Sequence, residues 1–328
     1  GHPYLGYSLT PDWDSEATPD KAPGSAGYQG QKSQNADGFR GPVPPLEKPE
    51  GVFRIATLGG SSTYGNSPSS DASTWPAQLQ VMLNERQSTN VEVLNAGAVG
   101  WNSHESLINL ALRVVDYEPD LILVYHTIND ARCALWTKGG EIQRDNTHWR
   151  ETWPSYRDTP TTDPWLEGSY TYLLWRKFFT PYFANRKELA FYAIRGYDPD
   201  DKDPYERGEL DPTGFRSFER NLLSIAGIAR AHGAQVMLAT QGCDREDIKA
   251  KSRHNQWKAM DYLGTVIEQV TEREQLLFCD ARKVLEAHAA SVGKDTIFTG
   301  EVHLTDAGAA KLAEIFADAI VEAKVLTD

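Results

Sequence analysis

Short apolar runs alternate with helical patterns along most of the chain. Apolar runs of the length of one buried strand occupy residues 53–58, 91–95, 120–126, 234–240 and 275–280. Helical periodicity occupies residues 75–83, 104–116, 214–232, 250–272 and 305–324. Because consecutive parallel strands are joined by crossovers, this alternation predicts a three-layer α/β/α sandwich around a five-stranded, doubly wound parallel sheet.

The clearest helical pattern starts at Trp75. Trp75, Leu79 and Leu83 recur at the spacing that places them on one face of a helix. Thr74 is the expected N-cap, and Pro76 falls in the first turn, where a backbone N–H has no partner within the helix. We therefore expect a helix that begins at residue 75.

Two stretches lie outside this alternation. Residues 1–50 are rich in Pro, Gly, Asp and Ser and carry no sustained period, so we expect an N-terminal extension of loops packed on a domain formed by residues 51–328. Residues 131–212 contain no clear strand and are expected to be an insertion in that domain. The insertion holds nearly half of the aromatic residues of the chain.

The aromatic residues of the insertion have two interpretations. They build a small core of the insertion's own, or some of them line a cleft and stack on a substrate such as a sugar ring. The tryptophans concerned are Trp136, Trp149, Trp153, Trp165 and Trp175. The acidic run at residues 198–203 lacks the spacing and the glycine of a calcium-binding loop, which favours a solvated turn.

Composition limits the possible partners. Lys and Arg total 33 against 46 Asp and Glu, a net charge of −13, which disfavours nucleic acid and anionic membranes as partners. No apolar run approaches the roughly 18 residues that a membrane-spanning helix needs. The chain opens with Gly1-His2-Pro3 and no methionine, which leaves open whether an upstream signal or anchor has been removed. The sequence indicates no oligomeric state.

The three cysteines, Cys133, Cys243 and Cys279, stand far apart in the sequence and form no CxxC pair. This odd and dispersed set predicts buried thiols rather than a disulfide framework or a zinc site. We expect neither a metal nor a cofactor.

Four residues with useful chemistry follow the predicted strands. Ligands of an open parallel sheet bind outside the carboxyl ends of its strands. Ser61 follows the first strand, Gly100 the second and Asn129 the third, while His303 precedes the last helix. We therefore expect these four residues in one cleft.

Together these residues predict nucleophilic catalysis. Gly59 and Gly60 allow a tight turn that leaves the Ser61 hydroxyl exposed beside a helix N-terminus, and His303 is the candidate base that activates it. Acyl transfer also needs donors for an oxyanion, which the Ser61 N–H, the Gly100 N–H and the Asn129 amide offer. Each residue alone has a plainer interpretation as a cap, a turn residue or a surface histidine, so the prediction rests on their joint placement.

The segment at residues 55–65 resembles the first block of the SGNH (GDSL-type) hydrolases. Gly60 stands where many members carry Asp, and the register implies that Ser61, not Ser62, is the nucleophile. Residues 95–100 resemble the second block, which implies Gly100 as a backbone oxyanion donor.

The other two blocks follow in the same order. Residues 127–130 are similar to the third block, usually Gly-x-Asn-Asp, and imply Asn129 as the side-chain donor; residues 302–308 are similar to the last block and imply His303 as the base. The resemblance spans roughly residues 51–325 apart from the insertion. It implies a flavodoxin-like sheet and, because similar proteins are often extracytoplasmic, a periplasmic or secreted location.

The last block departs from the family at one position. The family reads Asp-x-x-His, and the residue three before His303 is Gly300. The absence of this acid matters because, in a complete triad, the carboxylate fixes the imidazole tautomer and stabilises the imidazolium. Three interpretations stay open: a Ser–His dyad held by a carbonyl or water, a form of low activity, or Glu301 as the orienting acid. In a dyad, Gly300→Asp is expected to raise turnover.

The leading hypothesis is a serine esterase that removes O-acetyl or other short acyl groups, from a carbohydrate or polysaccharide. The expectation of a carbohydrate substrate rests on the family resemblance and on the aromatic insertion. Three alternatives remain: an acyltransferase that uses the same site, a carbohydrate-binding relic of low activity, and a flavin-binding protein suggested by the hydroxyl-rich loop at residues 61–66.

Overall fold

The structure of the protein is a computed structural model. It describes residue 5 and residues 8–9, 11–14, 32–42, 44–135, 141–146, 169, 171–172, 210–246 and 254–326. The tryptophans of the insertion and the acidic run at residues 198–203 lie outside these described residues.

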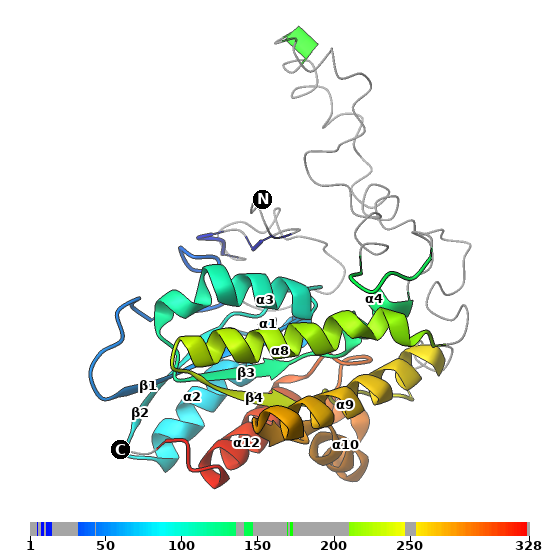
Figure 1. The fold of residues 1–328 in the computed structure, drawn as a ribbon. Helices are drawn as coiled ribbons and strands as arrows, with labels where there is room; N and C mark the ends of the chain where they lie inside the picture. Colours follow the sequence, from blue (N-terminus) through cyan, green and yellow to red (C-terminus); the bar gives the residue numbers. More distant parts are fainter. Residues whose placement is uncertain are drawn as a thin grey trace.

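A five-stranded parallel sheet with strand order β2-β1-β3-β4-β5 forms the centre of the fold (Figure 1). The strands are β1 Val52–Gly59, β2 Asn90–Asn95, β3 Leu121–Tyr125, β4 Gln235–Ala239 and β5 Leu277–Cys279. Each coincides with one of the five apolar runs. The predicted fold class, a doubly wound α/β sandwich, is confirmed.

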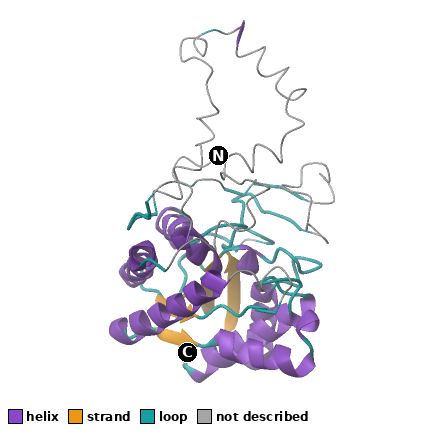
Figure 2. Ribbon diagram, turned by 90° about the vertical axis from the view of Figure 1, so that its right-hand side faces the viewer, coloured by secondary structure: helices purple, strands orange, loops and turns teal. Residues whose placement is uncertain are grey.

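Helices cover both faces of the sheet, and Figure 2 shows the strands between the two groups. One group packs in a core with alternate sheet residues and comprises α3 Ser103–Leu112, α4 Ile128–Leu135, α8 Arg216–Ala231 and α9 His254–Glu274. The other comprises α2 Trp75–Arg86, α10 Ala281–Val292, α11 Lys294–Ile297 and α12 Asp306–Glu322. A short helix, α1 Ser61–Tyr64, follows β1, and single 3-10 turns occupy Val114–Tyr117 and Pro212–Phe215.

The apolar runs have no polar alternation because both faces of each central strand are buried. In β3, Ile122 and Val124 belong to the core under α8 and α9, whereas Leu121, Leu123 and Tyr125 belong to the core under α2 and α12. Successive side chains of a strand point to opposite faces, so a strand covered by two helical layers needs an apolar residue at every position.

The helix expected from residue 75 begins there, as α2, but its expected capping bond is absent, and one segment boundary differs from the sequence expectation. Thr74 is the N-cap residue of α2, but its hydroxyl donates to the Asp71 carbonyl oxygen and caps no helical N–H. Local turn bonding competes with capping for a threonine hydroxyl, and here it wins. After β3, the helix α4 continues through Leu135, beyond the predicted start of the insertion at residue 131.

The sequence pattern does not predict α10. Its buried residues are Ala281, Leu285 and Ala289, which include a single large side chain, while Val284 and Val292 are exposed. A stripe this narrow gives little periodic signal.

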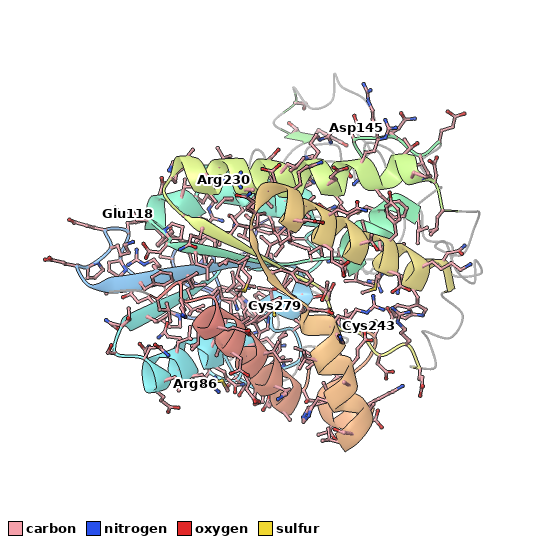
Figure 3. All side chains as sticks on the ribbon, turned by 60° about the horizontal axis from the view of Figure 1, so that its bottom comes forward. Arg86, Glu118, Asp145, Arg230, Cys243 and Cys279 are labelled. Atoms are coloured by element: carbon pink, nitrogen blue, oxygen red, sulfur yellow. The ribbon has the colours of Figure 1, made fainter. Side chains whose placement is uncertain are left out.

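The described part of the N-terminal extension packs on the sheet. Phe39 is buried in the core under α3, and Arg40 forms a bridge with Asn95 at the end of β2. Within the described residues no helix has the length and apolar character needed to cross a membrane. All three cysteines are buried thiols, as predicted; Figure 3 labels Cys243 and Cys279.

Candidate active site

Four segments meet at the carboxyl ends of the strands. Ser61 begins α1 directly after β1, Gly100 lies in the turn between β2 and α3, and Asn129 lies at the start of α4 after β3. His303 lies between α11 and α12. The chain runs from β1 to β2 on one side of β1 and then crosses to β3 on the other side, so β1 and β3 flank the switch point at which open sheets bind ligands.

The Ser61 hydroxyl contacts the His303 imidazole. Ser61 Oγ lies 2.9 Å from His303 Nε2, although 242 residues separate the two in sequence. Ser61 is only 8% exposed, at the first turn of α1. The structure thus brings the predicted nucleophile and the predicted base within hydrogen-bond reach of one another.

The turn into α1 needs a glycine for space. A Cβ on Gly60 would lie 2.7 Å from Asn129 Nδ2 and 3.0 Å from the Trp101 carbonyl oxygen. The φ of Gly60 is −87°, outside the left-handed region. Close approach of the Asn129 amide, rather than backbone freedom, is therefore what a side chain at residue 60 would disturb.

The candidate oxyanion donors lie on the turns that follow β1, β2 and β3. The Ser61 N–H and the Gly100 N–H donate to no residue in the described part of the chain. Asn129 Nδ2 donates one hydrogen to the Trp101 carbonyl oxygen at 2.8 Å, which holds the amide beside Gly60 with its second hydrogen left over. Unpaired donors of this kind can stabilise an oxyanion.

The environment of His303 favours the neutral imidazole. Burial, and less strongly the Arg132 cation, lowers the pKa of His303 from 6.5 to about 4, whereas the Glu301 carboxylate opposes this and Lys32 reinforces it. A charged imidazole loses hydration when it is buried, so the neutral form dominates near neutral pH. A neutral imidazole can accept a proton from Ser61.

Glu301 does not orient His303 in this structure. Glu301 Oε2 accepts hydrogen bonds from Arg132 at 2.7 Å and from Gln256 at 3.3 Å. Among the described residues, the His303 ring has a single hydrogen bond, to Ser61. Gly300 has a φ of +146° and no atom within 4 Å of a Cβ built on it, so neither candidate position brings a carboxylate to Nδ1.

The sequence analysis missed two buried residues beside the pair. Ser62 Oγ donates to the Val302 carbonyl oxygen at 2.9 Å and accepts from Gln241 Nε2 at 3.1 Å. Gln241 follows β4 within two residues. The rule that locates ligands at the carboxyl ends of strands would have indicated Gln241 if it had also been applied to the fourth strand.

A buried polar cluster supports the start of α4. Both carboxylate oxygens of Asp130 accept from the Ser103 N–H at 3.1 Å, and Oδ1 also accepts from its hydroxyl at 2.5 Å. Burial raises the pKa of Asp130 to about 7. Because Ser103 begins α3, this contact joins the segment that carries Gly100 to the segment that carries Asn129.

Nothing in the described ranges suits a metal ion: they contain no cluster of three or more His, Cys, Asp or Glu side chains with that arrangement.

Proteins of known structure to which this chain is similar include LAE5 and Axe2. LAE5, an alpha/beta hydrolase enzyme from the metagenome of Lake Arreo, Spain, is 15% identical over 84% of this chain and 97% of its own, with a TM-score of 0.48. Axe2, an acetylxylan esterase from Geobacillus stearothermophilus, is 15% identical over 82% of this chain and 94% of its own, with a TM-score of 0.46. A search of curated proteins gives no match.

A single sequence match takes in all four candidate site residues and the end of β1 together with the other four strands. That match covers residues 57–311, from the end of β1 into α12, and it is to the GDSL-like lipase/acylhydrolase family. The span includes Ser61, Gly100, Asn129 and His303. The chain belongs to the GDSL-like lipase/acylhydrolase family.

Proposed function

We propose that the protein is a serine esterase in which Ser61 is the nucleophile and His303 is the general base. The observation that carries this proposal is the 2.9 Å contact between Ser61 Oγ and His303 Nε2. A serine hydroxyl becomes nucleophilic when a base within hydrogen-bond reach takes its proton. Membership of an acylhydrolase family supports the same class of reaction.

In the acylation step, Ser61 Oγ attacks the ester carbonyl carbon and its proton moves to His303 Nε2. The carbonyl oxygen becomes negatively charged and accepts hydrogen bonds from the Ser61 N–H, the Gly100 N–H and the Asn129 amide. The tetrahedral intermediate then expels the alcohol, which takes the proton from His303, and leaves acyl-Ser61. Water, deprotonated by His303, releases the carboxylic acid and restores the serine.

We propose a Ser–His dyad in preference to a triad. Glu301 is engaged with Arg132 and Gln256, and Gly300 carries no side chain. The His303 carbonyl oxygen accepts from the Thr299 N–H at 2.9 Å, within the short hairpin formed by residues 298–304. These backbone contacts hold the histidine. A fixed backbone is an alternative way to orient an imidazole when no carboxylate contacts its second nitrogen.

The proposed substrate is an O-acetyl or other short acyl ester of a carbohydrate. Two observations support this class: the family is one of acylhydrolases, and residues 131–212 are rich in aromatic residues of the kind that stack on sugar rings.

The direct test measures acetate release from acetylated xylan, mannan and pectin and from p-nitrophenyl acetate. Ser61→Ala is expected to lower turnover by at least about 10³-fold, because the covalent route is lost. Ser291→Ala, which removes an exposed hydroxyl on α10, is the matched control and should turn over at the wild-type rate. Acetate release that survives Ser61→Ala would contradict the proposed mechanism, and failure on every ester would contradict the esterase itself.

The same preparation separates the three alternatives. An acyltransferase forms acylated product when a sugar acceptor is added, a carbohydrate-binding relic retains glycan without releasing acetate, and a flavin protein is yellow. Acetate release without these signatures is the result that the esterase predicts.

A further inference from the structure

We infer that Gln241 and Ser62 are positioning residues for the catalytic pair, because they tie the Asn129 turn and the backbone of His303 to the helix that carries Ser61. The inference rests on the proposed esterase function, since it assigns these side chains a task in that reaction. Neither residue touches the reacting atoms; both act through their neighbours.

Gln241 uses both ends of its amide. Its Oε1 accepts from the Thr127 hydroxyl at 3.0 Å and from the Ile128 N–H at 2.9 Å, and its Nε2 donates to Ser62 Oγ at 3.1 Å. The Ile128 N–H is only a donor, so Oε1 must face the turn and Nε2 must face Ser62. Because Asn129 follows Ile128 directly, this contact sets where the Asn129 turn stands relative to α1.

Ser62 links Gln241 to the backbone beside His303. Since Gln241 Nε2 donates to Ser62 Oγ, the hydroxyl hydrogen is directed to the Val302 carbonyl oxygen, 2.9 Å away. That carbonyl belongs to the peptide group joining Val302 to His303. The Thr299 N–H binds the His303 carbonyl oxygen on the other side, so both peptide groups of the histidine are held.

These contacts orient the imidazole in place of the missing acid. In a triad the carboxylate orients the imidazole through its second nitrogen. Here the ring forms a hydrogen bond only with Ser61 among the described residues, and its position depends on the backbone at Val302 and His303. Ser62 and Gln241 are 5% and 4% exposed, so water does not readily replace their hydrogen bonds.

The test compares Ser62→Ala and Gln241→Met with Thr240→Val. Thr240 is buried on the same turn, but its hydroxyl donates to Asp280 and accepts from the Arg282 N–H, away from the site. Thr240→Val therefore removes buried hydrogen bonds of the same kind without touching the catalytic pair. Steady-state kinetics on p-nitrophenyl acetate and urea unfolding are measured for all four proteins.

Ser62→Ala and Gln241→Met are expected to lower kcat by about 10- to 100-fold with KM changed less than about threefold, because small displacements of catalytic groups act on the chemical step. Thr240→Val should lower the unfolding midpoint and leave kcat within about twofold of the wild type. If Thr240→Val lowers kcat as much as the other two, or if all three leave it unchanged, the positioning role is wrong.

A second readout separates this inference from the esterase proposal. The His303 imidazole signal, assigned by its loss in His303→Gln, is titrated by NMR in the full-length proteins. Ser62→Ala should move the apparent pKa of His303 upward, toward its ordinary value, as the hairpin loosens and water reaches the ring; Thr240→Val should not. A wild type without esterase activity would end the proposed function, whereas an unchanged His303 titration in Ser62→Ala would end the positioning role.

Discussion

At the scale of single residues, Ser61 and Ser62 are adjacent in sequence and have different partners. The Ser61 hydroxyl faces the His303 imidazole, whereas the Ser62 hydroxyl lies between the Gln241 amide and the Val302 carbonyl oxygen. A hydroxyl that already donates to a carbonyl is a poor nucleophile, because its proton has no route to a base. The geometry therefore favours the same serine as the family register.

Burial of His303 predicts that the acid limb of the pH–rate profile lies at an unusually low pH. The pKa of His303 is lowered from 6.5 to about 4, chiefly by burial. Since only the neutral imidazole accepts a proton, kcat/KM on p-nitrophenyl acetate should rise through about pH 4 and be level by about pH 6. Arg132→Gln removes a cation that lowers this pKa, so its acid limb should shift to higher pH. An inflection near pH 6.5 in the wild type would contradict the burial seen here.

The strained backbone at Gly300 changes what a restored acid would do. Because φ is +146° there, a side chain at residue 300 is expected to cost about 1–3 kcal/mol of stability. We predict that Gly300→Asp lowers the unfolding midpoint and, contrary to the expectation from sequence, does not raise kcat above the wild type. Gly300→Ala carries the same strain without the carboxylate. A kcat of Gly300→Asp above both Gly300→Ala and the wild type would show that the carboxylate reaches His303.

At the scale of elements, the N-terminal extension helps to hold α1, the helix that begins with Ser61. Arg40 donates to the carbonyl oxygens of Tyr64 and Gly65 at the carboxyl end of α1 and pairs with Asp71 at 2.6 Å. A cation at the carboxyl end of a helix satisfies carbonyl groups that have no partner within the helix. Residue 40 therefore acts on the same short helix that presents Ser61.

The contacts of Arg40 with Tyr64, Gly65 and Asp71 form a clamp, and their loss should lower the stability of the fold. The Arg40 side chain is 1% exposed and that of Asp71 22%, so Arg40→Ala removes the cation beside a half-buried carboxylate, which keeps its hydrogen bonds from Ser33, and removes a donor to two carbonyls. We predict a loss of about 2–4 kcal/mol in the free energy of urea unfolding. Arg86→Ala is the matched control, because its pair with Asp318 is exposed on both sides and should cost less than about 1 kcal/mol. Equal losses would mean that the Arg40 clamp adds nothing.

At the scale of the whole molecule, two apolar cores share one sheet. Leu58 belongs to the core under α8 and α9, and Leu123 belongs to the core under α2 and α12. Because alternate residues of the same strands build both cores, neither layer is expected to persist without the other.

Truncation on either face should therefore destabilise the entire fold. Leu58→Ala and Leu123→Ala are each expected to cost about 2–5 kcal/mol and to lower a single unfolding transition followed by circular dichroism and tryptophan fluorescence. Val81→Ala, at a position that is 55% exposed on α2, should change the free energy of unfolding by less than about 0.5 kcal/mol. Separate transitions for the two leucine variants would show that the layers unfold independently.

The sequence by itself determined the sheet and the residues at its carboxyl ends. Apolar runs mark the strands, most clearly the central ones, β1, β3 and β4, because both faces of these strands are largely buried, and this signal is local. The order of strands and turns then places Ser61, Asn129 and His303 at one end of the sheet. The sequence pattern did not predict α10 because its buried face has only one large side chain.

Only the tertiary structure decided how those residues are held. Glu301 pairs with Arg132, 169 residues away, and the bond from Ser62 to Val302 spans 240 residues. No period or motif encodes such contacts, because they depend on where distant loops end after the sheet has formed. The need for glycine at residue 60 has the same origin, since it comes from the close approach of Asn129 rather than from the backbone of the turn.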